Sequence, residues 1–168
     1  MSTREELIAQ ILKASGGRIV GRIRLQKMIY LLQQLGLGSD FKFSYHHYGP
    51  YSEEASTAVQ RAAAIGKLIK ETETPLSYGG FYSEFELVAA QASDRIGNLA
   101  ERDAKQFASL MKAETSVVLE LAATIHWLKS KEKVSDWEKE LRLRKPGKAS
   151  QENTARAKKL LSSLGLAA

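Results

Sequence analysis

The histidines are the first residues to examine for chemistry, because imidazole can bind a metal ion or act as a general base. His46 and His47 are adjacent, and neighbouring side chains of an extended segment point to opposite faces, so this pair would not converge on one ion. His126 lies in an apolar stretch, where a hydrogen-bonded position in or beside the core is the simplest expectation. The chain contains no cysteine and no HExxH spacing. We therefore expect no metal site and no bound cofactor.

Serine and glycine motifs offer little more chemistry. No GxSxG sequence marks a nucleophilic serine, and no local motif ties a serine to a histidine and an acid. The segment 16–21, GGRIVG, lacks the spacing of a phosphate-binding loop, so we interpret it as a connection between helices. Gly79-Gly80 is typical of a turn. With no catalytic constellation to assemble, we predict that the protein is not an enzyme.

Glu120 is the acid in the least expected surroundings. It lies within the apolar stretch 117–123, where an unpaired charge would be costly. It must reach the surface, pair with a cation or take up a proton. We predict a structural ion pair, with Arg22, Arg24 and Lys27 as candidate partners. The alternative is burial with a raised pKa, which would point to acid–base chemistry.

The net charge of +6 is unevenly distributed along the chain. Residues 1–90 contain 10 Lys and Arg against 9 Asp and Glu, whereas residues 129–159 contain 11 against 5. Such a skew is typical of proteins that bind nucleic acid or an acidic partner, and also of a solvated, lysine-rich helical surface. Both interpretations stay open at this point.

Length and composition indicate one globular domain over residues 1–168. Hydrophobic residues make up 43% of the chain and charged residues 26%, which is ordinary for a folded protein. No run of about 18 apolar residues could cross a membrane, and the start lacks the pattern of a secretory signal. The absence of cysteine suits a cytoplasmic protein.

Hydrophobic periodicity predicts alternating helices and short strands in the first half of the chain. The predicted helices cover residues 4–14, 23–35 and 52–65, with Gly66 closing the third. Alternating aromatic residues predict a strand near 41–48, ended by Gly49-Pro50, and the runs 68–69 and 81–87 predict a hairpin. This order of elements fits a winged helix-turn-helix for residues 1–90.

The second half of the chain is predicted to be helical. The expected helices cover residues 93–110, 115–129, 134–143 and 151–164, with a linker at 145–148. The predicted fold class is therefore mainly α with a small β-hairpin (α+β). A winged-helix-like N-terminal half packs on a C-terminal helical bundle, residues 91–168, that carries the basic tail.

A nucleic-acid-binding function is one hypothesis. Its contacts would come from the basic start of the second helix and from the basic tail: Arg22, Arg24, Lys27, Arg142, Arg144, Lys145 and Lys148. However, Glu53 and Glu54 stand at the start of the next helix, where a helix-turn-helix places its base-reading residues. Two carboxylates would repel the phosphates there, which argues against ordinary reading of the major groove.

Four short motifs resemble a known family. They are GRIRLQKMIYLL (21–32), YGPYS (48–52), GKLI (66–69) and LELAATI (119–125). The first two resemble the LQK helix and the YGP turn of the Panacea domain, the SocA-type antitoxin family, and of its YwgA-like relatives. The segment 33–37, QQLGL, departs from the aromatic-rich Panacea pattern, and the tail continues past Lys145-Pro146. Both departures favour the YwgA-like branch.

The resemblance implies a mainly helical domain with a small hairpin and, as in many family members, an antitoxin that neutralises a toxin by direct protein–protein binding. Our leading hypothesis is therefore a protein-interaction domain whose partner could be a cognate toxin. The contact residues would be Lys27, Tyr45, His47, Tyr48 and Tyr51, because tyrosines beside a glycine-proline turn make a rigid amphipathic surface. The alternative for each of these aromatic residues is packing onto the second helix.

Overall fold

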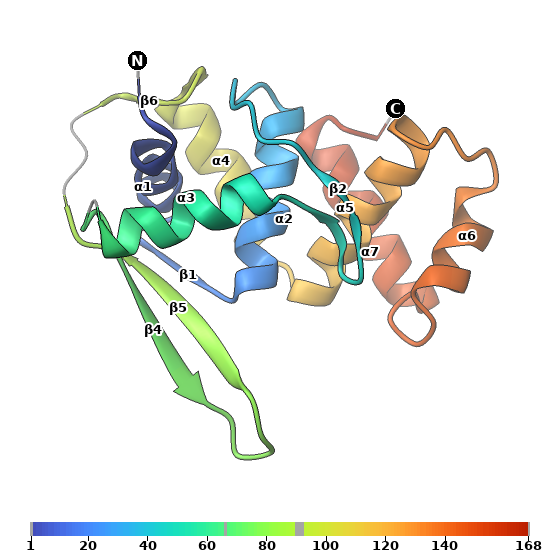
Figure 1. Ribbon diagram of the computed structural model, residues 1–168. Coiled ribbons are helices and arrows are strands. Elements are labelled where there is room, and N and C mark those ends of the chain that lie inside the picture. Colours follow the sequence, from blue (N-terminus) through green and yellow to red (C-terminus); the bar gives the residue numbers. More distant parts are fainter. Residues whose placement is uncertain (1, 66, 90–92, 168) are drawn as a thin grey trace.

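The computed structural model describes residues 2–65, 67–89 and 93–167, and Figure 1 shows how its elements are arranged. The helices are α1 (Arg4–Ala14), α2 (Arg22–Gln34), α3 (Glu53–Ala64), α4 (Glu101–Lys112), α5 (Ser116–Ser130), α6 (Trp137–Arg144) and α7 (Gln151–Leu164). The strands are β1 (Arg18–Val20), β2 (Ser44–His46), β3 (Gly49–Tyr51), β4 (Ile69–Pro75), β5 (Phe81–Leu87), β6 (Arg95–Ile96) and β7 (Leu99–Ala100). The fold is mainly helical with small antiparallel sheets, which confirms the predicted α+β class, although a single hairpin was predicted and the described residues form three small sheets.

Capping side chains explain why several helices begin where they do. The hydroxyls of Thr3, Ser52, Thr115 and Ser150 each accept a backbone hydrogen bond in the first turn of α1, α3, α5 and α7. The bounds of α1 and α7 agree with the prediction, and α3 is one residue shorter at each end. Gly66, the predicted end of α3, lies outside the described residues.

The helix α5 runs through the centre of the molecule and packs against α2, α6 and α7 (Figure 1). All its residues from 118 to 125 are buried, as expected for a helix that is apolar on most sides. Its buried residues belong to the same core cluster as those of α1 and α2. The two halves of the chain therefore share one hydrophobic core.

A three-stranded antiparallel sheet has the order β1-β5-β4. The β4–β5 hairpin extends away from the helices, and β4 forms an open edge (Figure 1). The segment 16–21, predicted to be a loop, contains the strand β1. Of its three residues only Ile19 is buried, and so short a strand gives no detectable periodicity.

The strands β2 and β3 form a second hairpin, which turns at His47-Tyr48. The predicted strand over 41–48 is shorter in the structure, because Phe41 enters the core and is only 3% exposed. Gly49-Pro50 was predicted to end the extended segment, but in the structure it begins β3. The strand β3 contacts both α2 and α5, so this hairpin lies on the junction of two helices.

The predicted helix over 93–110 begins later, at Glu101. The residues before it form the small β6–β7 hairpin, which turns at Gly97-Asn98. Gly97 has a φ of 56°, and a side chain there would collide with the carbonyl oxygen of Leu37. The Asn98 backbone N–H donates to that same oxygen (2.8 Å), so this turn docks against the end of α2.

The helix α6 begins at Trp137, three residues later than predicted, and buries only Leu141. None of the described helices is long and apolar enough to cross a membrane. The first half has the order helix, strand, helix, hairpin, helix, hairpin. Its interpretation as a winged helix remains a prediction.

Candidate functional site

The LQK and YGP motifs meet in space. Lys27 is completely buried, and its Nζ donates to the carbonyl oxygen of Pro50 (2.6 Å). The neighbouring Gln26 holds Ser52 by two hydrogen bonds: its Nε2 donates to the Ser52 carbonyl and its Oε1 accepts from the Ser52 N–H, both at 3.0 Å. Two consecutive side chains of α2 therefore hold the backbone of β3 and of the residue that follows it.

Gly49 allows this hairpin to approach α5 closely. Its φ is 90°, a conformation that other residues adopt only with strain. A Cβ at this position would lie 2.7 Å from Oγ1 of Thr124. The glycine of the YGP motif thus satisfies both a backbone requirement and a packing requirement.

Glu120 forms a buried ion pair with two lysines from the segment after α6. The carboxylate is 2% exposed and lies 2.9 Å from Nζ of Lys145 and 3.1 Å from Nζ of Lys148. Lys145 is itself buried and also donates to the carbonyl oxygen of His47 (2.8 Å). The ion pairs of Glu120 are therefore with lysines 145 and 148, and not with the candidates named from the sequence.

Burial and the charges of this cluster both act on the pKa of Lys27. The pKa of Lys27 is lowered from 10.5 to about 7, chiefly by burial and in the same direction by the positive charges of Lys145 and Lys148. The nearby carboxylate of Glu120 opposes the shift and favours the charged ammonium. Near neutral pH the cluster therefore contains a buried amine that exists in both protonation states.

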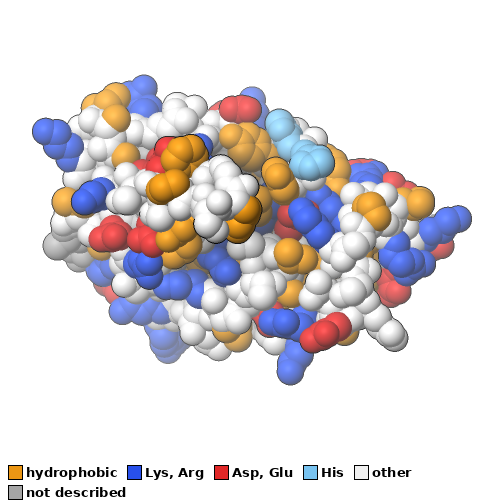
Figure 2. All heavy atoms as spheres, turned by 90° about the horizontal axis from the view of Figure 1, so that it is seen from below, with side chains coloured by type: hydrophobic (Ala, Val, Ile, Leu, Met, Phe, Trp, Pro, Cys, Tyr) orange, Lys and Arg blue, Asp and Glu red, His pale blue; other side chains and the backbone are white. Residues whose placement is uncertain are grey.

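The turn of the β2–β3 hairpin carries the exposed side chains of this region. His46 and His47 are exposed, and Tyr48 is 44% exposed with Nζ of Lys148 lying 4.8 Å from its ring centroid. We call these four residues the hairpin-tip surface. Figure 2 shows histidine side chains at the surface near lysine or arginine side chains.

The other predicted partner residues are less accessible. Lys27 has no exposed surface, so it cannot belong to an external contact surface in this conformation. Tyr45 is half-buried beneath Arg144, whose guanidinium lies 4.8 Å from the ring centroid, and burial raises its pKa. Tyr51 is also half-buried and packs against His46. Of the predicted residues, His47 and Tyr48 face solvent.

The two arginines predicted to contact nucleic acid from α2 have partners within the protein. Arg22 contacts the carboxylates of Glu71 (2.6 Å) and Glu73 (2.9 Å) on β4. Arg24 donates to the carbonyl oxygen of Glu114 (2.8 Å), and burial lowers its pKa. Both arginines fasten α2 to neighbouring elements.

The basic tail is also largely engaged. Arg144 pairs with Glu132 (2.7 Å) and with Glu140 (2.8 Å), and these bonds raise its pKa. Lys145 is buried against the carboxylate of α5. Arg142 is exposed, and no ion pair within the described residues involves it. The structure therefore does not bring the seven predicted residues together as one basic surface.

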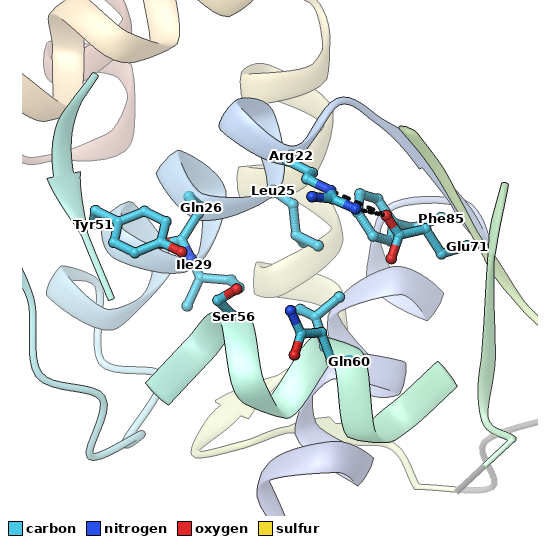
Figure 3. Close-up of a pocket in the computed structure, with 10 residues that line it drawn as sticks. Arg22, Leu25, Gln26, Ile29, Tyr51, Ser56, Gln60, Glu71 and Phe85 are labelled. Carbon is cyan, nitrogen blue, oxygen red and sulfur yellow. Dashed lines mark hydrogen bonds and ion pairs between the residues drawn. The ribbon is translucent and has the colours of Figure 1, made fainter. Parts of the chain in front are cut away.

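A small cavity of about 90 Å³ lies between α2, α3 and the three-stranded sheet (Figure 3). Its lining residues are Arg22, Leu25, Gln26, Ile29, Tyr51, Ser56, Val59, Gln60, Glu71 and Phe85. This cavity could not be predicted from the sequence, because its walls come from four segments that are far apart in the chain. The one available signal was Ser56 and Gln60, two polar residues at helical spacing beside the apolar face of α3.

The third histidine lies inside the molecule. His126 is half-buried, its Nδ1 shares a hydrogen bond with the Tyr30 hydroxyl (2.8 Å), and burial lowers its pKa. Across residues 2–65, 67–89 and 93–167, no group of three or more His, Cys, Asp or Glu side chains could hold a metal ion.

Comparison with known proteins places these features in a family. No family model matches the chain. Over 112 residues the chain is 30% identical to the uncharacterized protein YwgA of Bacillus subtilis, a match that covers 67% of each protein. The chain belongs to the YwgA family. Membership of the wider Panacea domain family remains a prediction.

A second relative is an enzyme by name. The chain is 29% identical over 148 residues to a DNA ADP-ribosyl glycohydrolase of Thermus aquaticus, covering 80% of this chain and 38% of the relative. This similarity contradicts the prediction that the protein is not an enzyme, because the relative that matches most of this YwgA-family chain has the name of an enzyme. The chain spans less than two-fifths of that relative's length, so the similarity leaves most of the glycohydrolase unmatched.

The close approach of Gly49 to α5 can be tested by substitution. Gly49→Ala is expected to lower the free energy of unfolding by about 2–5 kcal/mol, since it adds both left-handed strain and overpacking. Gly79→Ala is the matched control, because Gly79 has a φ of 97° but open space around it. Adding Thr124→Ala should recover part of the loss. Equal effects of Gly49→Ala and Gly79→Ala in chemical denaturation would contradict the packing argument.

The buried Lys27 predicts a specific pH dependence of stability. Between pH of about 7 and 10.5 the unfolded chain holds this proton more tightly than the folded protein, so stability rises with pH across that window. The free energy of unfolding of wild type minus that of Lys27→Met should rise by roughly 1–4 kcal/mol from pH 7 to 10, at about 1.4 kcal/mol per pKa unit. Lys42→Met, which removes an exposed lysine, is the control measured in parallel. A flat difference for Lys27→Met would refute the shift.

Proposed function

We propose that the protein acts by binding a protein partner through the hairpin-tip surface. The observation that carries this proposal is the exposed turn His47-Tyr48. The backbone of its hairpin is held by the buried side chains of Lys27 and Lys145. An exposed tyrosine held in one position offers a large amphipathic contact with little entropy left to lose on binding. Lys148 beside the ring adds a positive charge at the edge of the contact.

The energetic cost of burying the polar cluster of Lys27, Glu120 and Lys145 supports a role for this cluster in positioning the hairpin. Burying Lys27, Lys145 and Glu120 costs solvation free energy, and apolar residues of similar volume would often stabilise the fold as well or better. Buried polar networks can instead specify one arrangement of the elements that they join. We attribute that role to this cluster, whose hydrogen bonds all end on the backbone or side chains around the β2–β3 hairpin.

The partner that we propose is a cognate toxin, neutralised by direct binding. The support for this is the resemblance to SocA-type antitoxins of the Panacea domain, whose two best-matched motifs contact one another here. The absence of cysteine suits a toxin and antitoxin that meet in the cytoplasm. Lys27 takes part in this proposal only as support for the hairpin, because it is buried.

A capture experiment with matched variants tests the proposed surface. The full chain, His47→Ala/Tyr48→Ala and the control Tyr78→Ala would be tagged in the native host at native expression, and the captured protein identified and then titrated in purified form. Tyr78 is 85% exposed on the other hairpin, so its loss removes an aromatic side chain elsewhere. The tip variant should bind at least about 30-fold more weakly, as expected for loss of a hot spot.

Two outcomes would count against this function. One is the absence of any stable protein partner for the wild-type chain at native expression. The other is a captured partner whose affinity is the same for wild type and for the tip variant, with circular dichroism showing both to be folded.

A second candidate function is action on ADP-ribosylated DNA. The similarity to a DNA ADP-ribosyl glycohydrolase across 80% of this chain favours it. The winged-helix interpretation of the first half and the exposed Arg142 are compatible with contact to DNA phosphates. This candidate differs from the first in the class of partner, so the two can be separated.

A release assay and a binding assay test the second candidate. The purified chain would be incubated with ADP-ribosylated DNA, and free ADP-ribose measured by mass spectrometry against a protein-free blank. Unmodified and modified oligonucleotides would also be compared in a shift assay at low and moderate salt, where phosphate contacts give strong salt dependence. No release and no shift at low salt would eliminate it.

A further inference from the structure

The cavity between α2 and α3 combines an apolar floor with polar groups that the protein leaves unused (Figure 3). Its floor is formed by buried side chains of Leu25, Ile29, Val59 and Phe85. Its polar lining includes Arg22, Gln26 and Glu71, which bond within the protein, and also the half-buried Tyr51 and Ser56 and the exposed Gln60. In the described part of the chain, none of the last three side chains has a hydrogen-bond partner.

The charges at the cavity are neutralised within the protein. Arg22 donates to Glu71 through both Nε and Nη2, and Glu71 also accepts from the Ser83 hydroxyl (2.8 Å). An anionic ligand would meet the carboxylate of Glu71, and a cationic ligand would compete with Arg22 for it. The site therefore favours an uncharged ligand.

The volume sets the size of that ligand. A buried water needs roughly 10–15 Å³ measured in this way, so the cavity of about 90 Å³ has room for roughly six to nine non-hydrogen atoms. That is one ring with small substituents. The neighbouring amide of Gln60 offers a donor and an acceptor side by side, which complements an amide edge on such a ring.

We infer that this cavity binds a neutral, planar, single-ring heterocycle that carries an amide edge. The ring would lie against Leu25, Ile29 and Phe85, while Gln60 and Ser56 hydrogen-bond its polar edge. A pyrimidine base and nicotinamide are two sources of this chemistry. No residue of the hairpin-tip surface lines the cavity, and the two proposals concern different classes of ligand, so either can fail without the other.

Titrations of the full-length chain followed by ¹H–¹⁵N NMR test the site. The probes are thymidine, uridine and nicotinamide, with toluene as an apolar ring of similar size that has no amide edge. The heterocycles should shift the signals of Ser56, Gln60 and Phe85 at millimolar concentration. Shifts with the nucleosides alone identify a base as the source, and shifts with nicotinamide alone identify the pyridine amide; both results support the proposal.

Two Gln→Leu substitutions at helix positions separate an effect on ligand recognition from an effect on folding. Gln60→Leu keeps the shape of an exposed side chain but removes its amide, and should weaken binding about fivefold or more, the loss expected for one to two hydrogen bonds. Gln106→Leu on α4 is also exposed and should bind as wild type does. Absence of shifts with all three heterocycles, toluene binding as tightly as they do, or unchanged binding by Gln60→Leu would each overturn the proposal.

Discussion

The buried carboxylate of Glu120 is the constraint on which the rest of the structure depends. It stands on the central helix α5 and is the counter-charge for two lysines that arrive from the segment after α6. One of them, Lys145, also holds the backbone of the β2–β3 hairpin at His47. Without this carboxylate, the ammonium groups that fix the hairpin would lie in the core with no negative charge near them, a state that proteins avoid.

The helices were the part of the fold that sequence could predict. Thr3 and Ser150 mark the starts of α1 and α7, and regular apolar spacing carries each helix to its observed end. The apolar stretch around Glu120 also indicated a buried helix and an acid that needs a cation. These are local signals, since a cap or a helical stripe is complete within one or two turns.

The site depends on long-range geometry that a single sequence does not contain. Lys27 stands in a motif with other basic residues and resembles a surface residue, yet the β2–β3 hairpin covers it completely. The lysines that pair with Glu120 lie beyond another helix, on either side of Pro146-Gly147, so no spacing rule connects them to the carboxylate. The same applies to β1. Its single buried residue, Ile19, cannot be recognised as part of a strand without the pairing to β5.

The bond between Lys145 and the His47 carbonyl joins positions 98 residues apart, which has a consequence during synthesis of the protein. The β2–β3 hairpin leaves the ribosome long before the lysine that holds its turn, and contacts of such separation form late. A chain interrupted before residue 145 therefore carries the hairpin with the contacts of Lys27 and Gln26 but without that of Lys145. The turn of the β2–β3 hairpin thus gains this last contact only when most of the chain has been made.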